Sequence, residues 1–90
     1  MTSKKIIFTG RVQGVGFRYI TKQLALGFEI VGWVKNLADG TVELQIMGED
    51  DEVDDFIREI IEESELSPLI KEHTIWEIDP LSGAKGFRIV

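Results

Sequence analysis

The sequence predicts an α+β two-layer sandwich, in which two helices cover one face of an antiparallel sheet. Three observations lead to this prediction. The chain has 90 residues, the size of a single domain with one core, here residues 1–90. Apolar and polar residues alternate over 41–47, which is typical of a half-buried strand. Apolar residues over 53–61 recur instead at helical spacing.

The first third of the chain predicts a strand, a helix and a second strand. Residues 5–9 (KIIFT) form the first strand, and a glycine-rich loop over 10–16 follows it. Four apolar residues then recur close to helical spacing and predict a helix over 17–27: Phe17, Ile20, Leu24 and Phe28. Residues 30–36 (IVGWVKN) are rich in β-branched and aromatic side chains, which favours a strand.

An Asp-Gly turn within residues 37–40 joins this strand to 41–47, so the two strands are expected to form a hairpin. In the second of them three residues face inward: Val42, Leu44 and Ile46. Their polar neighbours and Met47 face outward: Thr41, Glu43, Gln45 and Met47.

The second helix is indicated by five apolar residues at i, i+3, i+4, i+7 and i+8: Val53, Phe56, Ile57, Ile60 and Ile61. The acidic residues 49–52 crowd its first turn, where the helix dipole favours negative charge, so we interpret them as a helix start and not a metal site. Residues 64–68 end this helix. A strand over 70–78, whose buried face the pattern does not select, and a short strand over 86–90 complete the chain. Up to residue 78 the order of elements is β-α-β-β-α-β, which predicts the ferredoxin-like topology, and the short strand follows it.

Composition and charge exclude several classes of protein. The chain lacks cysteine, so it has no disulfide framework or thiolate nucleophile, and a cytoplasmic location is expected. No apolar run approaches the roughly 20 residues that cross a bilayer, so no membrane partner is expected. The net charge of −6 argues against a nucleic-acid partner. Residues 1–38 nevertheless hold six of the ten basic residues and only one of the sixteen acidic ones, which favours a small anion there.

The segment GRVQGVGFR, residues 10–18, combines features that converge on a phosphate or a carboxylate. Glycines let backbone N–H groups approach an anion closely, and the following helix start adds unpaired N–H groups. Arg18 can place two hydrogen bonds on phosphate oxygens. From this pattern alone, a tight strand-to-helix turn with a surface arginine stays open as an alternative. The segment is not an NTPase P-loop, because it lacks the Gly-Lys-Ser/Thr sequence. Val12 stands where cysteine-dependent phosphatases place their nucleophile.

The surroundings of this loop restrict the chemistry it could perform. The loop holds no Ser, Cys or His, and residues 1–28 contain no Asp or Glu. The single histidine, His73, lies far along the chain and is interpreted as structural. An enzyme built here has no evident general base and no metal ligands, so its leaving group must depart without protonation. A carboxylate meets this condition, since its conjugate acid has a pKa of about 4. An acyl phosphate is such a substrate.

Residues 10–18 and the segment GWVKNLADGTVE, residues 32–43, together resemble the acylphosphatase family, and the likeness extends over nearly the whole chain. The resemblance implies the ferredoxin-like fold and hydrolysis of acyl phosphates without a metal or cofactor. It implies that Asn36 positions the attacking water and that Arg18 and the loop N–H groups bind phosphate. The phosphate-binding residues are then Gln13, Gly14, Val15, Gly16, Phe17 and Arg18. A monomer inhibited by its product, inorganic phosphate, is expected.

Several residues keep a plainer interpretation. An amide such as Asn36 can accept a hydrogen bond from water, although asparagine at a strand end is usually a turn former. Four others are interpreted as packing residues: Tyr19, Gly32, Trp33 and Trp76. Lys35 is interpreted as a solvated strand residue more than as a guide for the anion. Glu29 stands where the family usually has a glycine, so the first helix is expected to end differently, at Gly27.

Two other function classes compete with the enzyme. One is a non-catalytic anion-binding or regulatory domain, such as the related domain at the start of the hydrogenase-maturation carbamoyltransferases. The short chain and the presence of Asn36 favour catalysis over this reading. The other is an RNA-recognition module, which needs aromatic residues on an open sheet face and a basic surface. Glu43 and Gln45 face outward in an acidic chain and disfavour it.

Overall fold

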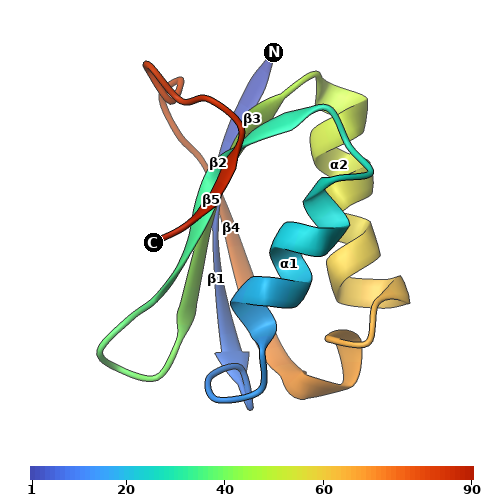
Figure 1. Ribbon diagram of the computed structural model, residues 1–90, viewed down its shortest axis with the longest axis vertical. Helices are drawn as coiled ribbons and strands as arrows, with labels where there is room; N and C mark the ends of the chain where they lie inside the picture. Colours follow the sequence, from blue (N-terminus) through green and yellow to red (C-terminus); the bar gives the residue numbers. More distant parts are fainter.

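The computed structural model describes residues 1–90 and has a five-stranded sheet with two helices on one side of it (Figure 1). The strands lie in the order β4-β1-β3-β2-β5. The elements in chain order are β1 Thr2–Gly10, α1 Phe17–Ala25, β2 Ile30–Asn36, β3 Val42–Gly48, α2 Asp50–Arg58, a π-helical turn Glu59–Glu63, a 3-10 turn Ser67–Leu69, β4 Ile70–Glu77 and β5 Phe87–Ile89.

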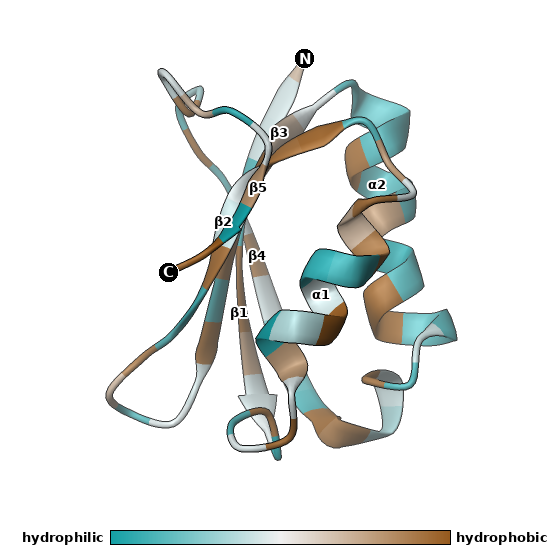
Figure 2. Cartoon of the chain, viewed as in Figure 1, coloured by the Kyte–Doolittle hydropathy of each residue, from teal (hydrophilic) through white to brown (hydrophobic).

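Alternation of burial along the central strands confirms the predicted inward face. Val42, Leu44 and Ile46 on β3 are fully buried. They pair with β1, where Ile6 lies opposite Leu44 and Phe8 opposite Val42, and these two side chains are buried as well. Figure 2 shows apolar segments along these strands and alternating with hydrophilic ones along α2. The buried side chains fill one layer between sheet and helices.

The last strand corrects the prediction of an antiparallel sheet. β5 pairs with β2 in parallel, with Gly32 opposite Phe87 and Val34 opposite Ile89, so the sheet is mixed. All other pairs are antiparallel. The direction follows from the connection: the chain leaves β4 at one edge, passes over the end of the sheet where β2 begins, and enters the opposite edge beside β2 (Figure 1).

The helix α2 buries the face that its spacing predicts, whereas in α1 the buried residues are Phe17, Thr21 and Ala25. The other predicted apolar residues of that segment are only partly buried against the core: Ile20, Leu24 and Phe28. In α2 and the turn that continues it, Val53, Phe56, Ile57 and Ile60 are buried. The final turn is π-helical, because the Ser64 amide donates to the Glu59 carbonyl at 2.8 Å. The helix α1 ends at Ala25, two residues before the predicted end. Tight turns follow, and Glu29 does not adopt a left-handed conformation. Its amide donates to a Glu52 carboxylate oxygen at 2.6 Å.

The outer edge strand β4 is more exposed than its apolar content suggests. Trp76 is 43% exposed, and its ring lies 4.9 Å from the Lys5 ammonium on β1. Trp76 thus packs on the surface of the sheet and lines no pocket, in keeping with its interpretation as a packing residue. β4 pairs with β1 alone, and most of its side chains on both faces remain in contact with solvent. No helix of the fold has the length and apolar character that crossing a membrane requires.

Candidate active site

Two buried side chains anchor the glycine-rich loop between β1 and α1. Val12 is 1% exposed and Phe17 is 2% exposed, and the Phe17 ring packs 5.2 Å from the ring of Phe8 on β1. Between these anchors Gly14 and Gly16 adopt left-handed conformations with φ of 75° and 79°. Residues with a Cβ rarely adopt such angles, so the loop turns tightly only because glycine stands at both positions.

The start of α1 opens toward the loop. Gly16 is its N-cap, and no side chain caps the helix. The first amide that bonds within the helix is that of Ile20, which donates to the Gly16 carbonyl at 3.0 Å. The N–H groups of residues 17–19 are thus left without an intrahelical partner, at the positive end of the helix dipole.

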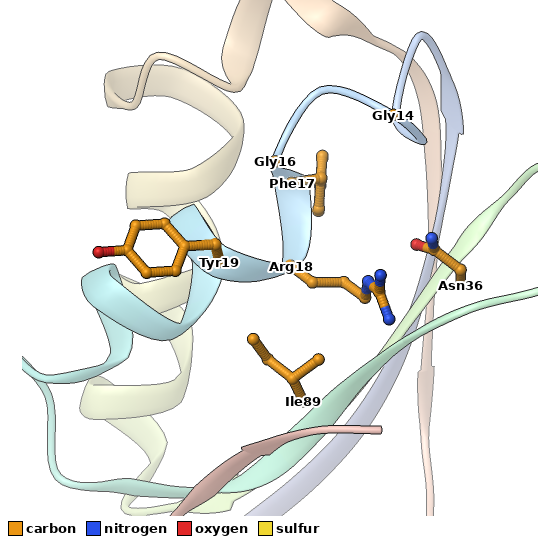
Figure 3. A pocket seen from close by; sticks show the side chains of 7 residues that line it. All are labelled: Gly14, Gly16, Phe17, Arg18, Tyr19, Asn36 and Ile89. Atoms are coloured by element: carbon orange, nitrogen blue, oxygen red, sulfur yellow. The ribbon is translucent and has the colours of Figure 1, made fainter.

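A pocket of about 200 Å³ lies at this helix start (Figure 3). It is lined by residues from the loop, from α1 and from the ends of two strands: Gly14, Gly16, Phe17, Arg18, Tyr19, Asn36 and Ile89. Figure 3 shows the Arg18 guanidinium reaching toward the Asn36 amide, while the Tyr19 ring points the opposite way and Ile89 lies on the side of the terminal strand.

The Arg18 side chain is held only weakly by the protein. Its one hydrogen bond runs from Nη1 to the main-chain oxygen of Val90 at 3.5 Å, and no Asp or Glu side chain forms an ion pair with it. A guanidinium carries five N–H donors in a planar fork. Most of the donors of Arg18 are therefore free to bind an anion in the pocket.

The side-chain oxygen of Asn36 has no hydrogen-bond donor within the protein. Asn36 is the last residue of β2 and pairs with Val42 on β3. Its Oδ1 atom is buried and accepts no hydrogen bond from the protein. A buried acceptor without a partner costs about 1–3 kcal/mol. A water molecule or a ligand donor in the pocket would satisfy it.

The turn that follows Asn36 is held from two sides. The Thr41 amide and hydroxyl both donate to Asp39 Oδ1, at 3.0 and 2.6 Å, and the hydroxyl bond in particular keeps the pKa of that carboxyl below its ordinary value. From the loop, the Gln13 side-chain amide donates to the carbonyls of Leu37 and Thr41, both at 2.8 Å. The hairpin turn is thereby fixed to the loop.

The pocket contains no carboxylate, imidazole or thiol. No cluster of three or more His, Cys, Asp or Glu residues occurs in the structure. His73 is exposed on β4, opposite Phe8 of β1, and does not line the pocket. A ligand in this pocket therefore meets backbone N–H groups, one guanidinium and one amide, which together suit an anion with a water molecule beside it.

The structure brings most of the predicted site residues together. Five line the pocket: Gly14, Gly16, Phe17, Arg18 and Asn36. Gln13 and Val15 do not line it, so their contribution to phosphate binding through loop N–H groups stays a prediction.

Two pocket residues were missed. Tyr19, interpreted as a packing residue, is 63% exposed and lines the pocket, and its place directly after Arg18 at a helix start was the available signal. Ile89 reaches the pocket through the pairing of β5, which its local sequence does not encode.

Fold and site together define a class of protein: a ferredoxin-like domain with a pocket between a glycine-rich loop, a helix start and a strand-end amide. The acylphosphatase family profile matches residues 4–89. The chain belongs to the acylphosphatase family.

Individual proteins agree with this assignment. The acylphosphatase of Geobacillus kaustophilus is 40% identical over 85 residues, which span 94% of this chain and 89% of that protein. The acylphosphatase of Methanospirillum hungatei is 48% identical over 60 residues, 67% of this chain and 66% of that protein, slightly less than two thirds of its length. The crystal structure of an acylphosphatase from Bacillus subtilis superposes with a TM-score of 0.89 at 37% identity, covering 100% of this chain and 99% of that chain.

These similarities confirm two of the predictions made from the sequence, the family and the ferredoxin-like α+β fold. The relatives bear the name of an enzyme of the predicted class, a hydrolase of acid anhydrides. Family membership and the names of the relatives support acyl phosphate hydrolysis as the activity.

Proposed function

We propose that this protein hydrolyses acyl phosphates by direct attack of water on phosphorus. The N–H groups of the loop and the Arg18 guanidinium hold the phosphoryl group, and Asn36 Oδ1 holds the attacking water. The observation that carries the proposal is the buried, unpartnered Oδ1 atom beside a nearly free guanidinium. A site for binding an anion alone has no use for that acceptor.

The reaction needs no group that the pocket lacks. The water oxygen forms a bond to phosphorus as the bond from phosphorus to the bridging oxygen breaks. The carboxylate leaves with the electron pair and requires no proton, because it is the anion of a strong enough acid. One proton of the water ends on a phosphate oxygen, so the products are a carboxylate and inorganic phosphate. Arg18 and the helix start stabilise the charge on the phosphoryl oxygens.

In-line displacement places the leaving group opposite the water. Asn36 and Ile89 lie on different sides of the Arg18 side chain in Figure 3, so the acyl group extends toward Ile89. That part of the pocket is open and apolar, since the Ile89 side chain lines it and is 39% exposed. It offers surface contact and no directed hydrogen bond to a carbonyl, which suits a range of acyl groups.

The proposal also covers the oligomeric state, the location and the partners of the enzyme. The enzyme acts as a single-domain monomer of the cytoplasm on a small molecule, and inorganic phosphate inhibits it by occupying the pocket. Its net charge of −6 disfavours nucleic acid as a partner, and membrane lipid is not part of the proposed reaction.

Phosphate release from benzoyl phosphate in the presence of EDTA tests the proposal. We expect turnover that EDTA does not reduce, and far slower turnover of p-nitrophenyl phosphate, whose leaving group is a weaker acid. Reaction in ¹⁸O-labelled water should place the label in phosphate. Label in the benzoate would show attack at the carbonyl carbon and contradict the mechanism. Phosphate binding without any turnover would favour the anion-binding domain instead.

A further inference from the structure

The Gln13 side chain joins the two segments from which the site is built. Its Nε2 group uses one hydrogen on the Leu37 carbonyl and the other on the Thr41 carbonyl, each at 2.8 Å. Gln13 lies in the loop that leads to Arg18, and Leu37 directly follows Asn36. These are the only side-chain hydrogen bonds between the loop and the hairpin turn.

The turn does not depend on Gln13 for its own closure. The Leu37 amide already donates to the Thr41 carbonyl at 2.9 Å, and the Gly40 amide donates to the Leu37 carbonyl at 3.2 Å. Each carbonyl therefore keeps a backbone donor if the glutamine amide is lost. What disappears is the link that fixes the turn, and with it the end of β2, relative to the loop.

We propose that Gln13 is a positioning residue that sets the place of the Asn36 amide relative to the bound phosphoryl group. Asn36 enters the pocket from β2, whereas the loop and Arg18 enter it from β1 and α1. In-line attack needs the water held by Asn36 to stand at a fixed distance from phosphorus, and misplacement by about 1 Å can cost 10²-fold in rate. The inference rests on the proposed function, because it assigns Gln13 an effect through the water held by Asn36.

A double-mutant cycle separates this role from binding and from general stability. Gln13→Met keeps the length of the side chain but donates no hydrogen bond. Measured with benzoyl phosphate, kcat should fall at least about tenfold, while the inhibition constant of inorganic phosphate stays within about twofold. In the Asn36→Ala background the same substitution should change kcat by less than about twofold, because no positioned water remains to be misplaced.

The matched control is Gln45→Met. Gln45 also donates from Nε2, to Glu43 Oε2 at 2.8 Å, but does so on β3 and away from the pocket. This variant should leave both kcat and phosphate inhibition unchanged. A comparable loss of kcat in Gln45→Met would show that removing any such amide suffices, and would overturn the specific role of Gln13.

Other outcomes would contradict either the positioning role of Gln13 or the proposed attack of water on phosphorus. Equal factors for Gln13→Met in both backgrounds, or a loss of phosphate affinity as large as the loss of kcat, would overturn the positioning role alone. Wild-type turnover in Asn36→Ala would overturn the mechanism beneath it. If Gln13→Met does not fold, Gln13→Asn, which is too short to reach both carbonyls, takes its place in the cycle. In the wild-type protein, scalar couplings across the hydrogen bonds from Gln13 Nε2 must be present with phosphate bound, and their absence would overturn the inference.

Discussion

Arg18 allows the proposed site to be tested with a magnitude derived from its contacts. A guanidinium that places two charge-assisted hydrogen bonds on phosphate contributes about 1.5–3 kcal/mol through each of them. Losing both in Arg18→Ala should lower kcat/KM by roughly 10²- to 10⁴-fold, because each 1.36 kcal/mol is tenfold. Arg18→Lys keeps the charge but loses the planar fork, so about half of that free energy should be lost.

Folding should be almost unaffected by either substitution. The one hydrogen bond of Arg18 to the protein, at 3.5 Å to the main-chain oxygen of Val90, is long, so its loss should change the free energy of unfolding by less than about 0.5 kcal/mol. Initial rates with benzoyl phosphate, competitive inhibition by inorganic phosphate and urea denaturation would be measured on each variant. Arg11→Ala is the matched control, since Arg11 is exposed in the same loop and does not line the pocket. Near-normal inhibition by phosphate in a folded Arg18→Ala protein would refute the assignment.

Further predictions concern the pH profile, the loop and the apolar wall of the pocket. Because an arginine stays protonated and an amide does not titrate, kcat should be nearly independent of pH between about pH 6 and 8. The second ionisation of the substrate phosphate is the expected exception. A fall of kcat with rising pH near neutrality that disappears in His73→Gln would reveal a titrating catalytic group. Gly16→Ala should cost roughly 1 kcal/mol of unfolding free energy, because φ is 79° and strain, not a clash, opposes the methyl group; an unchanged denaturation midpoint would contradict this. Ile89→Ser should lower kcat/KM for benzoyl phosphate about three- to tenfold, because one or two apolar contacts are lost. The kcat/KM for acetyl phosphate should stay nearly unchanged. Equal losses of kcat/KM on both substrates would argue against a contact between Ile89 and the acyl group.

The parts of the fold that local patterns encode were predictable. The alternation over β3 identified Val42, Leu44 and Ile46 as buried, and the helical spacing after the acidic run identified the buried face of α2. In both, burial follows from a period that the sequence carries itself. The direction of β5 was not predictable, since three residues pair with β2 only after a long connection crosses the sheet. The α1 helix ends at Ala25 in tight turns, where the amides of Leu26, Gly27 and Phe28 each donate to a carbonyl three residues earlier, and the apolar spacing did not reveal this change.

The candidate site also combines residues whose proximity the sequence predicts with residues whose proximity it does not predict. Arg18 and the glycines stand in one continuous motif, so their convergence could be inferred from chain order alone. The motif also contains Gln13, but its side chain bonds to carbonyls 24 and 28 positions away. Every residue has a backbone carbonyl, so the sequence does not indicate which carbonyls a side chain will bond to. The link between Gln13 and the hairpin turn therefore could be found only in the structure. Ile89 was hidden for a related reason: its place beside Arg18 depends on the pairing of β5 and not on any local pattern.

The parallel edge strand also determines when the site can become complete as the chain folds. Arg18 and Val90, which meet through the docking of β5, are separated by 72 positions. Contacts of such sequence separation form only after the entropy of closing a long loop has been overcome, which slows folding relative to helical proteins of equal size. Both helices can be present while the wall formed by Ile89 is still missing. We therefore expect refolding chains to gain helical circular dichroism before the Ile89 side of the pocket forms by docking of β5 against β2.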